Sequence, residues 1–331
     1  MIDLSDSEMK AILQTIPVDP KEEGKFLGDL RFFPGRWYDP QTKKVVQPQE
    51  SLRRYEKILL QIARVEPIRY GRMHKGTPFY LMGWLAYEMK DYEKGVFYMD
   101  AALSEDVFNA PSKWMSLPAA AFIFLDDSNI DAAAHEITIE IRREVDSQLD
   151  RFSKQAGVNI DTDTLINKFF KPNASDHSYR SIMTSLLTFL LEGKDRITQL
   201  QLRSSHGSTL EPFITHLFKG GLIFESLLKK RYNTAGITLE KYLPAAKSDL
   251  ELKKELYKTG RPYKFEDLPN NIKNWEPEVF QERVVAIVYA VRNTSGHDLG
   301  WQDVFTNELY TTLYENIVNA IFWAIKKVHK I

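Results

Sequence analysis

The chain has no cysteine and almost no net charge. Its 331 residues include 44 lysines and arginines against 45 aspartates and glutamates, which leaves a formal net charge of -1. The lack of cysteine excludes disulfides and thiolate metal sites, and it fits a reducing compartment. The balanced charge excludes a global basic field, so any nucleic-acid site has to be local.

Long apolar runs and a secretory leader are also missing. The first residues, MIDLSDSEMK, lack the basic start and the apolar stretch of a signal peptide. The longest apolar run, LPAAAFIFL at 117–125, is about half the length needed to span a bilayer. We therefore expect a soluble cytoplasmic protein that makes no membrane contact.

The pattern of apolar residues predicts an all-α chain. From Ser51 onward they recur at helical spacing, and no alternating strand pattern of useful length occurs. The length is typical of about two domains. We expect an irregular arm over 1–50 with a short helix at 5–15, a helical domain over 51–165, and a second helical domain over 166–331. The polar stretch 154–178 is predicted to be a linker with one short helix.

The segment MGWLAYEMKDYEKGVFYMDAAL, at 82–103, resembles a tetratricopeptide repeat (TPR). Gly83 and Gly95 would let two antiparallel helices approach closely, and Met99 would fill the space between them. The following helices do not reproduce the spacing, and stable stacks usually need about three repeats. We therefore predict a repeat-like (TPR-like) helical domain, with a protein partner as a candidate ligand.

The run VVAIVYAVRNTSGH, at 284–297, carries the strongest functional signal. Apolar residues at 284, 287, 288 and 291 predict one buried helix face, with Arg292 just after it and Gly296 ending or bending the helix before His297. Short motifs recur by chance, and the same spacing occurs at Arg69 and His74. There, Pro67 and Gly71 interrupt any long apolar helix. The alternative for Arg292 is a helix-capping cation with no catalytic role.

The C-terminal half, from Ser178 onward, resembles the HEPN superfamily, whose all-α domains occur in prokaryotic toxins, antiphage proteins and CRISPR effector nucleases. The resemblance rests on RNTSGH at 292–297, an R-x4-6-H motif that includes Asn293, and on GGLIFESLLKKRY at 220–232, a helix that contains Glu225. It implies a four-helix bundle, a homodimer formed through this domain, and RNA cleavage without metal or other cofactor at a site shared by two subunits. A toxin or antiphage defence role follows from the resemblance alone.

The chemistry of this motif suits RNA cleavage. Histidine titrates near neutrality, so His297 can serve as acid or base, and Arg292 presents a permanently charged fork to phosphate oxygens. Asn293 is assigned a supporting role. A carboxylate on an apolar helix face is costly unless paired, so Glu225 either faces solvent or partners a basic group. We favour an ion pair to an arginine, with Arg292 as the candidate, over direct catalysis.

The other candidate residues have simpler interpretations as well. Lys229, Lys230 and Arg231 could follow an RNA backbone, but charge runs are usually solvated faces. His206 and His216 show no metal-ligand spacing, and we predict no metal site. We interpret Glu282 and Arg283 as a solvated face. The aromatic residues Phe32, Phe33, Trp37 and Tyr38 could stack on bases, although packing onto the helical domain is favoured.

Two functions remain open beside RNA cleavage. One is a non-catalytic helical scaffold that binds protein partners, as an inert HEPN-like member of a paired system would. The other is binding of a small nucleotide at the same basic cleft without cleavage. Exposure of Arg292 and His297 at a two-fold interface would favour the nuclease, whereas burial of both within one subunit would favour the scaffold.

Overall fold

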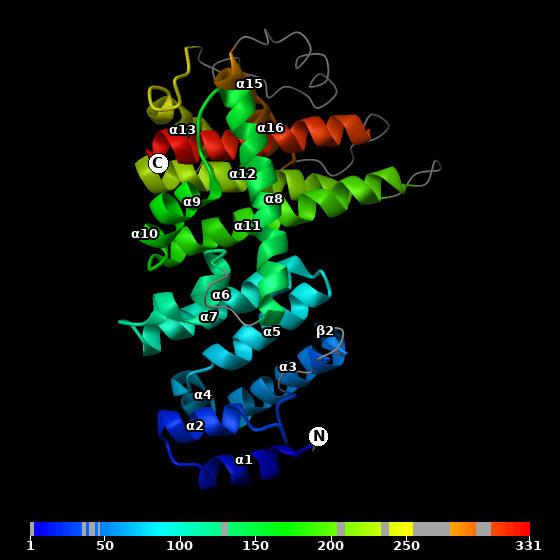
Figure 1. The fold of residues 1–331 in the computed structure, drawn as a ribbon, viewed down its shortest axis with the longest axis vertical. Coiled ribbons are helices and arrows are strands. Elements are labelled where there is room, and N and C mark those ends of the chain that lie inside the picture. The colour runs from blue at the N-terminus through cyan, green and yellow to red at the C-terminus, as the bar shows by residue number, and fades with distance from the viewer. Residues whose placement is uncertain are drawn as a thin grey trace. The chain divides into compact units, whose positions relative to one another are not determined.

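The computed structural model describes residues 3–34, 38–39, 44–45, 47–126, 132–203, 209–232, 238–253, 279–295 and 306–331. These residues are predominantly helical (Figure 1), so the predicted all-α class is confirmed. A minor addition is one antiparallel pair of two-residue strands, β1 (Tyr38–Asp39) and β2 (Lys44–Val45). Within the described ranges, no helix combines the length and apolar character that a bilayer crossing requires.

The chain divides into two compact units, residues 1–140 and 141–331. The division lies inside α8 (Ala132–Ala156), earlier in the chain than the boundary predicted near residue 165. The predicted linker at 154–178 is instead largely helical, with α9 (Thr162–Leu165), a π-helical turn at Ile166–Phe170, and α10 (Lys171–Asn173). The short helix predicted there is present, but the stretch packs into the core rather than forming an exposed linker, because Phe169 and Phe170 are fully buried.

The first unit is built from short and medium helices around a core centred on α3. Ser5 caps α1 through a capping box with Glu8, as expected for a helix that begins there. The predicted irregular arm also contains α2, which Asp19 caps and Pro20 begins. The elements are α1 (Asp6–Thr15), α2 (Pro20–Leu27), α3 (Pro48–Val65), α4 (Pro67–Arg72), α5 (Gly76–Glu88), α6 (Tyr92–Asn109), a 3-10 turn (Trp114–Ser116) and α7 (Pro118–Ile123).

Helices α5 and α6 form the predicted helical hairpin. A Cβ atom on Gly83 would lie 2.8 Å from Cγ of Met99, so only glycine permits this approach. Asp91 caps α6 by accepting a hydrogen bond from the backbone N–H of Lys94. The close packing is confirmed, while membership of a repeat family stays a prediction.

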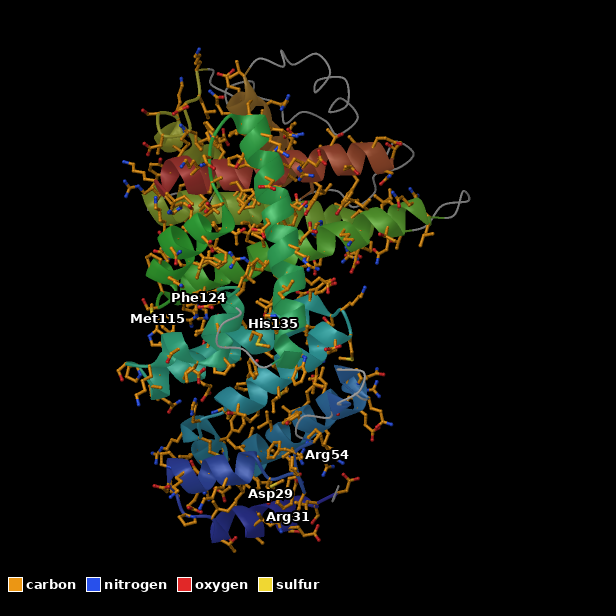
Figure 2. The ribbon with its side chains drawn as sticks, in the orientation of Figure 1. Asp29, Arg31, Arg54, Met115, Phe124 and His135 are labelled. Carbon is orange, nitrogen blue, oxygen red and sulfur yellow. The ribbon has the colours of Figure 1, made fainter. Side chains whose placement is uncertain are left out.

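The aromatic residues of the arm pack into the core of this unit. Phe33 is 1% exposed and its ring centroid lies 5.6 Å from that of Tyr55 on α3, and Phe32 is buried beside it. Arg31 pairs with the neighbouring Asp29 at 2.6 Å, and Arg54 donates to the backbone oxygen of Phe32 (Figure 2). The packing interpretation is confirmed for the two phenylalanines. Trp37 and the side chain of Tyr38 lie outside the described residues.

In the second unit three long helices pack against a fourth, α12. Figure 1 shows α11, α12 and α16 side by side, and α12 also packs against α13 and α15. The C-terminal half of α8 contacts α16, where Arg151 binds Glu315 at 2.6 Å. The apolar helix predicted to lead to Arg292 is present as α15. The helices of this unit are α11 (His177–Gln201), α12 (Glu211–Tyr232), α13 (Leu239–Ala246), α15 (Phe280–Ser295) and α16 (Asn307–Val328).

Candidate functional site at the end of α15

Arg292 lies in the last turn of α15, at the end of the predicted apolar face. The face is fully buried, with no exposed area at Val284, Ile287, Val288 or Val291. The helix continues to Ser295, so Arg292 belongs to the helix rather than following it. Burial of the face fixes the direction of α15, and the side chain of Arg292 emerges where that burial ends.

Glu225 of α12 binds Arg292. Its Oε2 atom accepts a hydrogen bond of 2.6 Å from Nε of Arg292, and the two side chains are 11% and 22% exposed. Gly221 permits this pairing, because a Cβ atom there would lie 2.9 Å from Cβ of Arg292. The guanidinium carbon also lies 5.5 Å from the ring centroid of Phe218. The predicted ion pair is therefore present, and it holds a permanent positive charge at the rim of the packed helices.

The histidine of the motif, His297, lies outside the described residues, as does Gly296. Asn293 is half-buried, and its side chain bonds Tyr289 one helical turn earlier. Burial raises the pKa of Tyr289, and the Asn293 bond opposes that rise. The supporting role assigned to Asn293 and the contact between Arg292 and His297 stay predictions.

The three basic residues at the end of α12 have different surroundings. Lys230 binds Asp176 at 3.0 Å and lies over the ring of Tyr179, whereas Lys229 and Arg231 are exposed. Lys229 and Lys230 also line a pocket between α11 and α12, and Arg231 is not among its lining residues. The pocket is not the Arg292 site, since Arg292 and Glu225 do not line it.

Sequence reasoning missed most of this pocket. Its other polar lining residues include Ser178, Ser181 and Ser185 on α11 and Lys219 on α12. The signal that could have revealed it is the spacing of three and four between the serines, which places the hydroxyls on one face of a helix. Serines do not contribute to apolar periodicity, so that periodicity does not reveal this row of three serines, the serine stripe of α11.

His216 is a core histidine rather than a metal ligand. Its Nε2–H donates to the backbone oxygen of Phe189 at 2.9 Å, and Nδ1 accepts from the hydroxyl of Tyr310 at 2.8 Å. Burial lowers the pKa of His216 to about 3. In the part of the chain that the structure describes, no three His, Asp or Glu side chains gather where they could hold a metal ion. His206 lies outside that part.

Glu282, at the start of α15, corrects a prediction. It is 5% exposed and accepts a hydrogen bond of 2.9 Å from the backbone N–H of Lys253, so it does not lie on a solvated face. Arg283 is half-buried and lies over the ring of Phe280. The prediction was wrong because the segment around Lys253, which is distant in sequence, covers this end of α15.

Comparison of the chain with protein-family models, with curated proteins and with solved structures found no match. The HEPN and tetratricopeptide resemblances therefore rest on the motifs alone. The site at the end of α15 has to be interpreted from its own geometry. That geometry is a half-buried arginine, held by one carboxylate, in the last turn before a histidine five positions further along the chain.

Proposed function

We propose that the chain is a metal-independent endoribonuclease of HEPN type, with Arg292 as phosphate clamp and His297 as acid or base. The observation that carries the proposal is the position of Arg292, which Glu225 orients through one nitrogen at the end of a buried helix. A guanidinium held in this way is pre-organised to stabilise charge that develops on a phosphate. Glu225 is then a positioning residue and touches no substrate.

The proposed reaction uses the RNA's own 2′-hydroxyl. A base removes its proton, the 2′-oxygen attacks the phosphorus, and the bond to the 5′-oxygen breaks as an acid gives that oxygen a proton. The products are a 2′,3′-cyclic phosphate and a 5′-hydroxyl. One arginine–histidine pair supplies one charge and one titrating group, whereas a two-fold dimer supplies both acid and base. Homodimerisation through the second unit is therefore part of the proposal.

Neighbouring cations on α12 would hold the RNA strand beside this site. Lys229 follows Glu225 by one turn of the helix, about 6 Å along its axis, and its side chain is exposed. Lys230 and Arg231 extend the positive charge to the end of α12. Contacts of this kind bind phosphates without regard to sequence, so they would give affinity rather than specificity. A toxin or antiphage role belongs to the proposal through the HEPN resemblance alone.

A cleavage assay on mixed RNA tests the proposal. We expect His297→Ala to lower the rate by about 10²–10⁴, the usual contribution of a general acid or base. Cleavage by the wild-type chain should persist in EDTA and leave 2′,3′-cyclic phosphate ends. The matched control is His74→Ala, which alters the histidine of the other R-x4-H copy and should leave the rate unchanged. Cleavage that survives His297→Ala, or that stops with chelator, would contradict the proposal.

A second candidate is a non-catalytic scaffold that binds protein partners through the first unit. It is favoured by two large apolar side chains on α6, Phe97 and Phe108, which are 65% and 83% exposed. Exposed aromatic residues are frequent anchors of protein interfaces. In this case the Glu225–Arg292 pair is purely structural, and the wild-type chain cleaves no RNA in the assay above.

A further inference from the structure

The pocket between α11 and α12 has the size of a small-molecule site. Its volume is about 750 Å³. Pockets of roughly 300–1,000 Å³ typically bind ligands of drug or cofactor size. The lining residues come from α11 and α12, two helices of the second unit.

The charge of the lining favours an anion. Three lysines contribute to it, and none of the described lining residues is acidic. Lys230 is held by Asp176 at 3.0 Å, and Lys219 by Glu192 at 3.5 Å. Lys229, by contrast, has no carboxylate within ion-pair distance among the described residues. An incoming anion would therefore bind Lys229 first and lie next to Lys230.

Hydroxyl groups supply hydrogen-bond donors at the same place. Ser181 donates to the backbone oxygen of His177 at 3.0 Å and is already used. The hydroxyls of Ser178, Ser185 and Ser226 bond no acceptor within the described part of the chain. Phosphate oxygens accept from both hydroxyls and ammonium groups, so this combination of donors matches a phosphate ester.

The length of the pocket and its apolar residues indicate which kind of phosphate ester would fit. Lys219 and Lys230 are eleven positions apart on α12, which corresponds to about 16 Å along the helix. Beside the serines, the lining between these two lysines includes the apolar residues Ile182, Leu222 and Ile223, of which Leu222 is exposed. Leu222 is 39% exposed and offers an apolar surface to a ligand in the pocket. An elongated ligand with phosphate at one end and a flat ring over these side chains fits this arrangement.

We propose that this pocket binds a nucleotide, with its phosphates at Lys229 and Lys230 and its base over Leu222. The inference goes beyond the proposed nuclease and competes with it for Lys229 and Lys230, which would bind either the phosphates of a nucleotide or the RNA strand. The Glu225–Arg292 pair lies toward α15, on a different side of α12 from the residues that face α11. A bound nucleotide would contact α11 and α12 together, and therefore two of the four packed helices of the second unit.

Calorimetric titration of the full chain with ATP, AMP and inorganic phosphate tests the assignment. Lys229→Glu should weaken ATP binding by about tenfold or more, because it removes a charge-assisted hydrogen bond and adds repulsion. Lys194→Glu is the matched control, since Lys194 is exposed on α11 and does not line the pocket. A second variant, Ser226→Leu, leaves the charge unchanged, fills the pocket, and should also weaken binding. Thermal unfolding of each variant checks that it folds.

Binding of single-stranded RNA is measured in the same way, with the His297→Ala variant. If the nuclease proposal is right, this variant does not cleave the RNA during the titration. Binding of ATP or AMP that falls with Lys229→Glu and Ser226→Leu, and not with Lys194→Glu, supports the nucleotide site. No nucleotide binding by the wild-type chain, or equal losses in Lys229→Glu and Lys194→Glu, overturns it. Binding of single-stranded RNA without any mononucleotide binding also overturns it, and would assign these lysines to the RNA path instead.

Discussion

The two R-x4-H copies place their arginines in opposite kinds of surroundings. In the first unit, Arg69 of α4 uses all three of its nitrogens within the fold. Its Nε binds Glu23 at 2.8 Å, Nη1 donates to the backbone oxygen of Leu13, and Nη2 donates to Ile16 and Pro17 at 2.9 and 3.1 Å. Arg69 is 11% exposed and joins α4 to the end of α1 and the loop after it.

In the second unit, the carboxylate that the described residues supply to Arg292 is that of Glu225, and the arginine is twice as exposed as Arg69. Glu225 engages its Nε, and the chain leads on toward His297. The first histidine, His74, binds Asp106 at 2.9 Å, so in that copy both residues of the motif are engaged in the fold. The difference teaches that the spacing alone says nothing about function. Among the described residues, the copies differ in how many hydrogen-bond donors of the arginine have a partner.

The largest expected effect is on stability, at Arg69. Arg69→Ala leaves the carboxylate of Glu23 buried and unpaired, together with three backbone oxygens that lose their donor. Breaking a buried pair in this way costs about 3–5 kcal/mol. Urea unfolding should show this loss, while Arg72→Ala, an exposed control on the same helix, should stay within about 0.5 kcal/mol of wild type. If both variants unfold like the wild type, Arg69 is not the structural link described here.

Arg292 should show the opposite behaviour, with a large effect on cleavage and a small one on stability. Arg292→Lys keeps a positive charge for Glu225 but loses the planar fork that matches phosphate oxygens. The rate should fall by about 10²–10³, the usual cost of losing one transition-state donor. Because lysine keeps a charge beside the buried Glu225, the unfolding free energy should change by less than the roughly 3–5 kcal/mol expected when a buried pair is broken. Arg283→Lys, on the same helix, is the control. If Arg292→Lys cleaves RNA at the wild-type rate, Arg292 is not a phosphate clamp. It would then be a structural residue, as Arg69 is.

The sequence predicted those features that depend on periodicity and on the cost of burying charge. The apolar spacing of α15 located Arg292, and the cost of a carboxylate on an apolar face predicted that Glu225 is paired. It could not predict features that depend on packing between distant segments. The buried environment of His216 needs Phe189 and Tyr310 from two other helices. Likewise, the serine stripe of α11 becomes a pocket only when α12 lies beside it.

A smaller effect concerns pH and separates the core histidine of the second unit from the histidine of the motif. The pKa of His216 is about 3 in the folded chain and about 6.5 in an unfolded one. Between these values the unfolded chain binds a proton that the folded chain does not, so stability falls as the pH is lowered below 6.5. The slope is about 1.4 kcal/mol per pH unit, or about 2 kcal/mol between pH 6.5 and 5.

Urea unfolding of the wild type and of His216→Gln across this pH range measures the contribution. His216→Gln should be less stable at neutral pH, because it cannot match both hydrogen bonds, but its stability should depend less steeply on pH. His329, whose pKa burial also lowers, contributes to both proteins and cancels in the comparison. Equal slopes would show that His216 is not the group responsible. A histidine with a pKa near 3 is uncharged throughout the neutral range, so a neutral-range step in the pH profile of cleavage would have to come from another histidine. His297 is the one that the nuclease proposal requires.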